Sequence, residues 1–223
     1  MLVNDVQSLL GKQVFVQLSG DKDFEGILTD SGKDVLVVYN GLKFYYIPWI
    51  HIHRVSLSNN FREKIDDPIE PSIAEDIGMI SYRKILTNAK GIFTEIYVTG
   101  NITFHGYITN VLSDYIVFYS PVFKMMYISL SHLKWLTPYN HNANPYTLDN
   151  ESLPFHPSNI PLLRSFDAQL KKEEGKLVVF DGGIDPMKIG LIKKVENNLI
   201  ELTAANGEIA YLRLNHIKSF HLP

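Results

Sequence analysis

Three histidines hold the same place in three similar stretches of the sequence, and their imidazole groups are the first candidates for chemistry. They are His51, His132 and His216. Each follows a tyrosine by five residues, and the tyrosines are Tyr46, Tyr127 and Tyr211. Histidine can ligate a metal or transfer a proton. A metal site needs converging ligands, and no histidine pair has the His-x-x-x-His spacing of a zinc-binding helix. We therefore expect the repeated histidine to make a structural hydrogen bond and to bind no metal.

Paired carboxylates are the second candidates, because acid–base catalysis often uses two of them. The pairs are Asp66-Asp67, Glu75-Asp76 and Glu173-Glu174. Each falls in a linker or on a helix face, without the apolar neighbours that would raise a carboxyl pKa. Asp181-Gly182-Gly183 is not followed by the lysine and serine of a phosphate-binding loop, so we predict a hairpin turn. The sequence thus predicts no catalytic, cofactor-binding or metal-binding residue, and a protein that is not an enzyme.

Aromatic residues crowd the later part of each repeated stretch. They are Phe44, Tyr45, Tyr46, Trp49, Tyr115, Phe118, Tyr119, Tyr127 and Trp135. Exposed aromatic rings can stack on single-stranded bases, but such sites interleave them with Arg and Lys. The net charge here is −3, whereas proteins that grip phosphates usually carry a basic excess. We therefore expect these rings to pack in a core or between domains, and we expect nucleic acid not to be a partner.

The repeat extends upstream of the tyrosine and the histidine. Gly26, Gly106 and Gly190 each follow the start of an apolar segment and precede the repeated histidine by 25 or 26 residues. A glycine inside a strand weakens it unless the strand bends sharply or another backbone approaches closely. One structural unit is therefore present three times, and it is defined by this glycine, tyrosine and histidine.

Alternation of polar and apolar residues predicts the strands of each unit. In the first unit they cover 13–18, 24–28, 35–39, 43–47 and 50–57, after a short helix at 4–11. In the second they cover 93–98, 103–109, 115–119 and 124–128, after a helix at 72–89. In the third they cover 176–180, 187–193, 199–203 and 208–212, after a helix at 159–172. Asn40-Gly41 is a strong hairpin signal between two of these strands.

A short helix and five bent strands in a unit of this size indicate a small barrel of the Sm or SH3 type. We therefore predict a mainly β fold of three tandem five-stranded barrels, each preceded by a short helix. The predicted divisions are 1–57, 72–137 and 159–223 for the barrels, with linkers at 58–71 and 138–158. The second linker is rich in Asn and Pro, and its apolar residues are expected to pack on neighbouring units. They are Tyr139, Tyr146, Leu148, Leu153 and Phe155.

Composition limits the setting in which the protein works. With 45% hydrophobic and 20% charged residues, the chain has the composition of a globular protein. Its lack of cysteine excludes disulfides and thiolate chemistry. No apolar run is long enough to span a membrane, and the N-terminus lacks the basic and apolar regions of a signal peptide. Synthesis in the cytoplasm, without a membrane partner, is the expectation.

The third unit resembles the repeat of the spore coat protein B family. The resemblance lies in the Gly182-Gly183 turn, the following Gly190, and the segment from Tyr211 through His216-Ile-Lys-Ser to Phe220. It extends more loosely to the first two units. The resemblance implies a structural component that is made in the mother cell, deposited in the spore coat and partnered by other coat proteins or by itself. Family members often continue into a low-complexity tail, which this sequence lacks, so no function of that tail carries over.

A weaker resemblance links the predicted barrels to Sm-like RNA-binding proteins. In that family an Arg-Gly pair in the second motif contacts RNA. The corresponding segments here begin at Tyr46, Tyr127 and Tyr211 and contain no such pair. The leading hypothesis is therefore a non-enzymatic structural protein of the spore coat that acts through protein–protein surfaces. The alternative is an Sm-like RNA-binding module.

Overall fold

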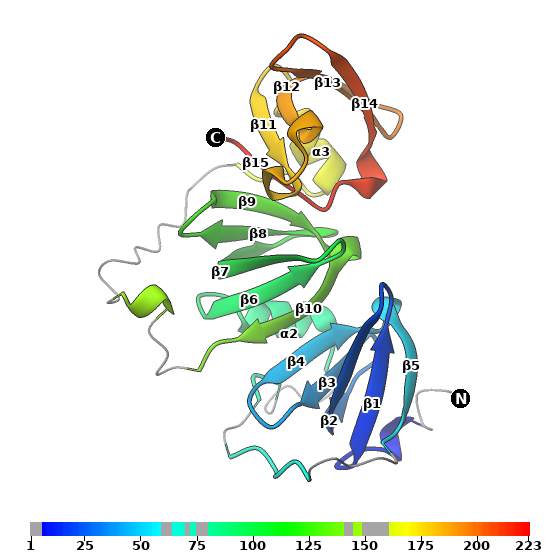
Figure 1. Ribbon diagram of the computed structural model, residues 1–223. Helices are drawn as coiled ribbons and strands as arrows, with labels where there is room; N and C mark the ends of the chain where they lie inside the picture. Colours follow the sequence, from blue (N-terminus) through cyan, green and yellow to red (C-terminus); the bar gives the residue numbers. More distant parts are fainter. Residues whose placement is uncertain (1–5, 59–63, 70–71, 75–79, 141–144, 149–160) are drawn as a thin grey trace.

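The computed structural model describes residues 6–58, 64–69, 72–74, 80–140, 145–148 and 161–223. It is mainly β, as predicted, and Figure 1 shows the three repeats following one another along the molecule from the first (blue to cyan) to the third (yellow to red). None of the described helices is long and apolar enough to cross a membrane.

Each repeat contributes five strands. Those of the first are β1 (Gln13–Leu18), β2 (Lys22–Ser31), β3 (Val35–Tyr39), β4 (Phe44–Pro48) and β5 (Ile52–Leu57). Those of the second are β6 (Phe93–Val98), β7 (Ile102–Val111), β8 (Tyr115–Ser120), β9 (Lys124–Ser129) and β10 (Leu133–Pro138). Those of the third are β11 (Leu177–Phe180), β12 (Ile189–Glu196), β13 (Leu199–Ala204), β14 (Ile209–Arg213) and β15 (Ser219–His221). A single 3-10 turn precedes each fifth strand, at Trp49–His51, Leu130–His132 and Leu214–His216.

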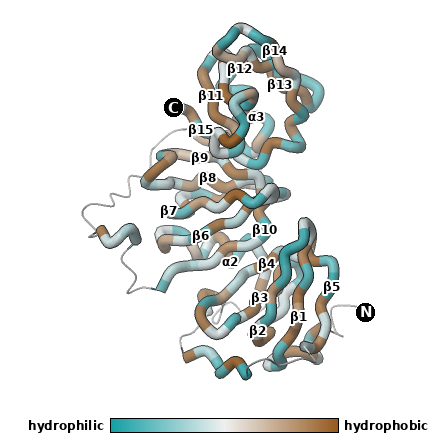
Figure 2. The backbone as a smooth tube through the Cα atoms, in the orientation of Figure 1, coloured by the Kyte–Doolittle hydropathy of each residue, from teal (hydrophilic) through white to brown (hydrophobic). Residues whose placement is uncertain are grey.

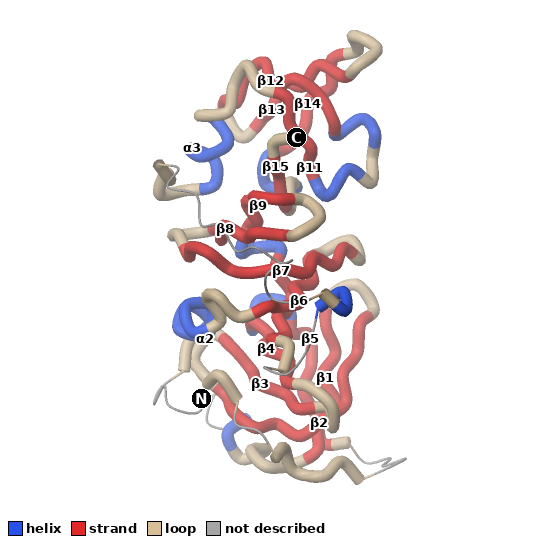
Figure 3. The backbone as a smooth tube through the Cα atoms, turned by 90° about the vertical axis from the view of Figure 1, so that its left-hand side faces the viewer, coloured by secondary structure: helices blue, strands red, loops and turns tan. Residues whose placement is uncertain are grey.

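All fifteen strands in the described part of the chain belong to one antiparallel sheet, which is not closed. The sheet order is β14-β13-β12-β11-β15-β9-β8-β7-β6-β10-β4-β3-β2-β1-β5. Within a repeat the fifth strand pairs with the first, and the first four pair in succession. The fourth strand of one repeat then pairs with the fifth strand of the next, as β4 does with β10 and β9 with β15. Figure 3, turned by 90° from Figure 1, shows the strands continuing from one repeat to the next.

Some strands alternate between buried and less buried residues, as the sequence pattern predicted, whereas β3, β4, β8 and β10 are buried along most of their length. β1 buries Val14, Val16 and Leu18, at every second position, and Figure 2 shows the hydrophobic colour recurring along the strands of all three repeats. The second strand of each repeat is longer than predicted and contains a register shift in its second half. Such a shift increases the local bend and twist of the strand.

The predicted helices at 72–89 and 159–172 are too long. Helix α2 spans only Tyr82–Asn88, and helix α3 spans only Phe166–Lys171. The cap of α2 is Ser81, whose Oγ accepts a hydrogen bond from the Lys84 N–H at 3.4 Å; Ser72 instead makes a local bond to the Ala74 N–H. Ser81 and Ser165 both have extended backbone angles, so neither helix continues towards the N-terminus. Of the predicted helix at 4–11, residues 6–7 are helical, and residues 4–5 lie outside the described residues.

The segment after β11 joins it to the antiparallel strand β12, so it is a hairpin connection as predicted, but a longer one than a tight turn. It contains two 3-10 turns, Asp181–Gly183 and Pro186–Lys188. Asp181 is buried, and its carboxylate accepts hydrogen bonds from the Lys188 ammonium at 2.5 Å and the Lys218 N–H at 2.8 Å. Burial alone would raise the pKa of this carboxyl, but the Lys188 and Lys218 contacts outweigh it and lower the pKa. A buried ion pair therefore organises this loop.

The repeated glycine lies where two neighbouring strands come close together. A Cβ at Gly106 would lie 2.1 Å from the Tyr119 carbonyl oxygen. At Gly26 and Gly190 it would lie 2.4 Å and 2.3 Å from the carbonyl oxygens of the equivalent residues, Tyr39 and Thr203. The glycine is thus required by close backbone approach rather than by an unusual φ.

Gly106→Ala is expected to lower the free energy of unfolding by about 1–3 kcal/mol, because the added methyl forces β7 and β8 apart. Gly207→Asn is the matched control: Gly207 lies in a hairpin turn with φ +86° and open space around it, and Asn tolerates that conformation. Urea denaturation followed by circular dichroism measures both. Equal stability of the two variants would contradict the close-approach explanation.

Candidate functional site

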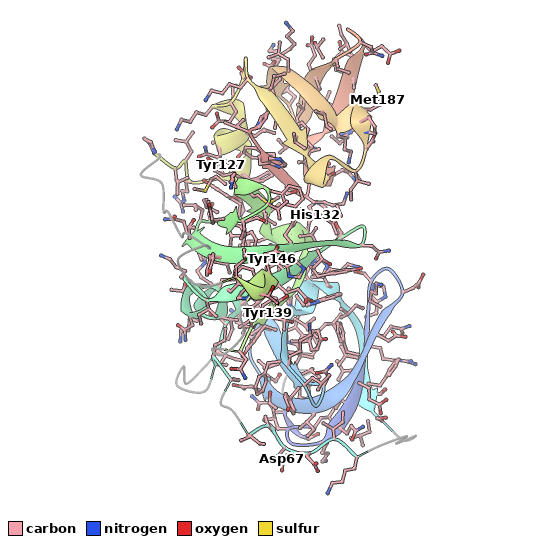
Figure 4. All side chains as sticks on the ribbon, turned by 60° about the vertical axis from the view of Figure 1, so that its left-hand side comes forward. Asp67, Tyr127, His132, Tyr139, Tyr146 and Met187 are labelled. Atoms are coloured by element: carbon pink, nitrogen blue, oxygen red, sulfur yellow. The ribbon has the colours of Figure 1, made fainter. Side chains whose placement is uncertain are left out.

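The residues that define the repeat meet at the junctions between repeats. Tyr46 of β4 pairs with Leu136 of β10, and Tyr127 of β9 pairs with Phe220 of β15. Tyr127 also stacks on Phe220, with ring centroids 4.6 Å apart and planes inclined by 16°. Figure 4 labels Tyr127 on the part of the second repeat that faces the third. The repeated tyrosine is therefore a junction residue.

Each junction buries a group of three equivalent residues on the third and fourth strands. In the first repeat these are Val35, Val37 and Tyr46, which belong to the core of the second repeat. In the second repeat they are Tyr115, Val117 and Tyr127, which belong to the core of the third repeat. The cores of the second and third repeats are thus each completed by the preceding repeat. Because burial of apolar area is the main stabilising contribution, neighbouring repeats stabilise one another.

The first junction also contains an aromatic cluster. Trp135 of β10 stacks on Tyr97 at 3.8 Å and meets Phe24 of the first repeat edge-on at 4.9 Å. Tyr45 completes the cluster, 6.3 Å from Trp135. Trp135 and Tyr97 of the second repeat belong to the core of the first repeat. At this junction each repeat therefore contributes residues to the core of the other. Stacked and edge-on ring pairs add stability beyond the area that they bury.

An acidic residue of one repeat caps the helix of the next. Asp34 accepts a hydrogen bond from the Tyr82 N–H, the first residue of α2, at 2.8 Å. Asp114 accepts one from the Phe166 N–H, the first residue of α3, at 2.9 Å. The first N–H groups of a helix have no partner within the helix, and an anionic acceptor there also interacts favourably with the helix dipole. These carboxylates therefore orient the incoming helix.

A lysine two residues after the repeated histidine closes the other side of each junction. The Lys134 ammonium donates to the Ser19 carbonyl oxygen of the first repeat. The Lys218 side chain lies against Gly100 of the second repeat and reaches the Asp181 carboxylate at 3.3 Å. A Cβ at Gly20 or Gly100 would lie only 3.0 Å or 3.1 Å from these lysine side chains and would crowd them. The two lysines thus occupy equivalent positions in the repeat, and the side chain of each lies beside a glycine of the preceding repeat.

The repeated histidines lie at the same junctions, and their burial differs. His51 is buried, His132 is half-buried and His216 is exposed. His132 bridges two repeats, because its Nε2–H donates to the Asn215 carbonyl oxygen at 2.9 Å while its Nδ1 pairs with the Thr99 hydroxyl at 2.9 Å. Burial first, with Lys218 and His216 adding to it, lowers the pKa of His132. For this histidine the structure contains the hydrogen bond that the sequence predicts.

His51 lies near the start of β10 and is more deeply buried than His132. Burial, then the Lys134 ammonium and His132, lower the pKa of His51 to about 4. Its Nε2 has no hydrogen-bond partner among the described residues. The ring is therefore neutral at neutral pH, and a proton on it would be a buried charge beside Lys134.

The repeated tyrosines show the same gradient as the histidines. Burial raises the pKa of Tyr46 to about 12, and its hydroxyl accepts a hydrogen bond from the Ile73 N–H at 2.9 Å. Burial, then Glu173, raises the pKa of Tyr127. Tyr211 is 67% exposed. Neither buried phenol is a proton donor near neutral pH, so both act through packing and hydrogen bonding.

A groove of about 860 Å³ runs along the second junction. Its walls include Asp114, Ser129, Ser131 and Asn215, with Ile50 contributed by the first repeat. Asp114 caps α3, and the two serine hydroxyls bond to each other at 2.9 Å. Asp114 is therefore engaged in holding the junction, and the two serine hydroxyls satisfy each other within the second repeat. Among the described residues no group of three His, Asp or Glu side chains could hold a metal ion.

The structure shows where the other sequence candidates lie. Most of the crowded aromatic residues are buried in the cores or junctions, including Tyr45, Phe118 and Trp135. Asp66 and Asp67 lie in the described part of the first linker, and Glu75-Asp76 lies outside the described residues. Glu173 is buried rather than on a solvated face; it pairs with Lys176 at 2.7 Å and bonds to Gln169.

The described part of the second linker packs on the second repeat. Tyr139 and Tyr146 both meet the ring of Phe93, at 5.2 Å and 6.1 Å, and the Tyr139 hydroxyl pairs with His105 at 3.0 Å. Figure 4 shows these two tyrosines close together. Leu148 is 43% exposed. Leu153 and Phe155 lie outside the described residues.

Sequence reasoning missed two kinds of junction residue, the capping aspartates and the lysines. A signal was present, because Asp34 and Asp114 directly precede the third strand of their repeats, where the third repeat has Asn198. Lys134 and Lys218 likewise share one position relative to the repeated histidine. What the sequence lacked was the partner, since each of these residues acts on a different repeat from its own.

The chain is therefore a mainly β protein of three repeats whose shared residues join one repeat to the next. Residues 165–220 match the family described as YwrJ third domain, and this range begins at the cap of α3 and ends in β15. A Bacillus subtilis (strain 168) protein described as uncharacterized protein YwrJ is 47% identical over 222 residues, covering 98% of this chain and 99% of that protein. The chain belongs to the YwrJ family.

Asp114→Ala removes the cap that the second repeat provides for α3, and it is expected to lower the free energy of unfolding by about 0.5–2 kcal/mol. Asp67→Ala is the control, because Asp67 is exposed and lies in the first linker. Chemical denaturation of both variants gives the comparison. If Asp114→Ala destabilises no more than Asp67→Ala, the capping bond does not hold the junction.

The lowered pKa of His51 predicts a loss of stability in mild acid. Between pH 6.5 and pH 4 the unfolded chain binds a proton at this residue and the folded chain does not, so the free energy of unfolding falls as pH falls. His51→Gln cannot titrate, and the stability difference between wild type and this variant should shrink from pH 7 to pH 4. A difference that stays constant over that range would show that His51 titrates alike in both states.

Proposed function

We propose that the protein is a non-enzymatic structural protein that acts through protein–protein surfaces, as a component of a bacterial endospore coat. In this proposal each repeat is a small barrel unit of the Sm or SH3 type, opened at its fourth strand so that the next repeat can pair there. The protein is made in the mother cell and deposited in the coat, where other coat proteins or further copies of itself are its partners.

One observation carries the structural role: residues at equivalent positions of successive repeats are used for joining. The tyrosine pairs across the junction, the capping aspartate orients the next helix, and the histidine bridges two repeats at the second junction. A site for catalysis would instead concentrate unusual groups in one place. The coat setting rests on the resemblance of the third repeat to the spore coat protein B family.

The barrel part of the proposal is supported by the bends in the second strand of each repeat. Gly26, Gly106 and Gly190 allow the close approach of neighbouring backbones, and each of these strands has a register shift. Glycines and bulges at such positions are how small sheets curve strongly.

RNA binding is the second candidate, and one surface feature favours it. Tyr211 is exposed on β14, and Arg213, two residues along the same strand, lies on the same face and is also exposed. An aromatic ring beside a guanidinium can stack on a base and contact its phosphate. Glu201, which pairs with Tyr211 on the neighbouring strand, opposes such binding by placing a carboxylate beside the ring.

The location of a fluorescent fusion in sporulating cells tests the proposal. A shell around the forespore, appearing late in sporulation, is the expected result. Diffuse fluorescence in vegetative cells would contradict the coat assignment. Fluorescence anisotropy with a single-stranded RNA then tests the second candidate, which requires an affinity that falls steeply with salt and is lost in Tyr211→Ala.

A further inference from the structure

Among the described strands the sheet has two free edges, and they lie at opposite ends of the repeat series. β14, the fourth strand of the third repeat, is one edge, and β5, the fifth strand of the first repeat, is the other. No described strand pairs with the outer side of either. In both internal junctions a fourth strand pairs with a fifth strand. The two free edges are therefore the two halves of one more junction.

The face of the third repeat next to β14 carries the residues that the internal junctions bury. Tyr46 and Tyr127 are 1% and 3% exposed, whereas Tyr211 is 67% exposed. Val35 and Tyr115 are fully buried, whereas their counterpart Leu199 is 40% exposed. The third member of each internal group is a valine, and here it is the partly buried Glu201. The equivalent surface is therefore covered by the following repeat in the first and second repeats, and it is exposed in the third.

The edge at β5 carries the matching residues. Val55 occupies the position of Leu136 and Phe220, the residues that pair with the repeated tyrosine in the two internal junctions. Both of those are fully buried, whereas Val55 is only partly buried. Leu57, two residues further on, is 46% exposed.

We infer that a second copy of the chain adds its β5 to the outer edge of β14, in the register that places Val55 opposite Tyr211. The antiparallel register then sets Leu57 opposite Ile209, which is 55% exposed. Two apolar pairs thus form along the seam, and pairs directly opposite each other stabilise a sheet. The inference rests on the proposed structural function and names its partner as the chain itself.

The assembly is head-to-tail, because the two edges differ. Such a contact is heterologous: it closes into a ring if the rotation between copies permits, and otherwise it grows into a filament. A strand with unpaired N–H and C=O groups is a ready template for another strand. Only Arg213 among the five residues of β14 is charged, so this edge has little of the charge that commonly guards free strands.

Two single-cysteine variants, Val55→Cys and Tyr211→Cys, test the inference in full-length protein. The chain has no cysteine of its own, so every crosslink reports a designed position. The two variants are mixed at equal concentration and treated with a short bis-maleimide. A crosslinked dimer that contains one chain of each kind should form several-fold more than with either variant alone. Leu42→Cys, at an 88% exposed turn position between β3 and β4, gives the background from random collision.

Two results would overturn the inference. One is crosslinking of the mixture no greater than that of Leu42→Cys. The other is a Tyr211→Cys dimer that forms as readily alone as in the mixture, which would indicate two-fold pairing of β14 with itself. Sedimentation velocity gives an independent readout: the mean mass of the wild type should rise with concentration, and Tyr211→Glu should abolish that rise.

The outcome is separable from that of the proposed function. If a fusion surrounds the forespore while the cysteine pair fails to crosslink, the protein is a coat component that binds other proteins and this inference is wrong. If the pair crosslinks while the fusion stays diffuse in vegetative cells, the self-assembly stands and the coat assignment fails.

Discussion

The pairing of a fourth strand with the fifth strand of the following repeat is the interaction on which this architecture depends. Without it, the first and second repeats would each expose an edge strand and a group of large apolar residues. With it, the open side of one repeat becomes part of the core of the next. The repeats therefore form one sheet and share their cores, as in repeat proteins whose stability is the sum of units and of interfaces between neighbours.

This dependence explains why identical residue types differ so much in environment. Tyr46, Tyr127 and Tyr211 have one position in the repeat, yet the first two are buried and the third is exposed. The histidines follow the same order from buried to exposed. What changes along the chain is whether another repeat covers the position. The pKa and the exposed fraction of a repeated side chain therefore depend more on whether a neighbouring repeat covers it than on its residue type.

Local patterns predicted the elements far better than their partners. Alternation located most strands to within a few residues, and the repeated glycine correctly indicated a close backbone approach. The helices were overestimated because helical composition continues before Ser81 and Ser165, where the backbone is extended. The junctions could not be predicted, since Asp34 or Lys134 has a meaningful role only when the partner repeat is known. That information lies in contacts far apart along the sequence, which local periodicity does not contain.

The loop at Asp181 shows how a repeat can keep its junction while changing the chemistry inside it. At the first junction Lys134 meets the carbonyl oxygen of Ser19, a neutral acceptor. At the second junction the equivalent lysine, Lys218, meets a buried carboxylate that Lys188 also neutralises. Breaking a buried pair leaves an uncompensated charge, so the second arrangement tolerates less change than the first. Asp181, Lys188 and Lys218 all belong to the third repeat, so this ion pair holds in place the lysine side chain that lies against Gly100 of the second repeat. The outer face of the third repeat carries the unburied tyrosine and leucine of a junction still open.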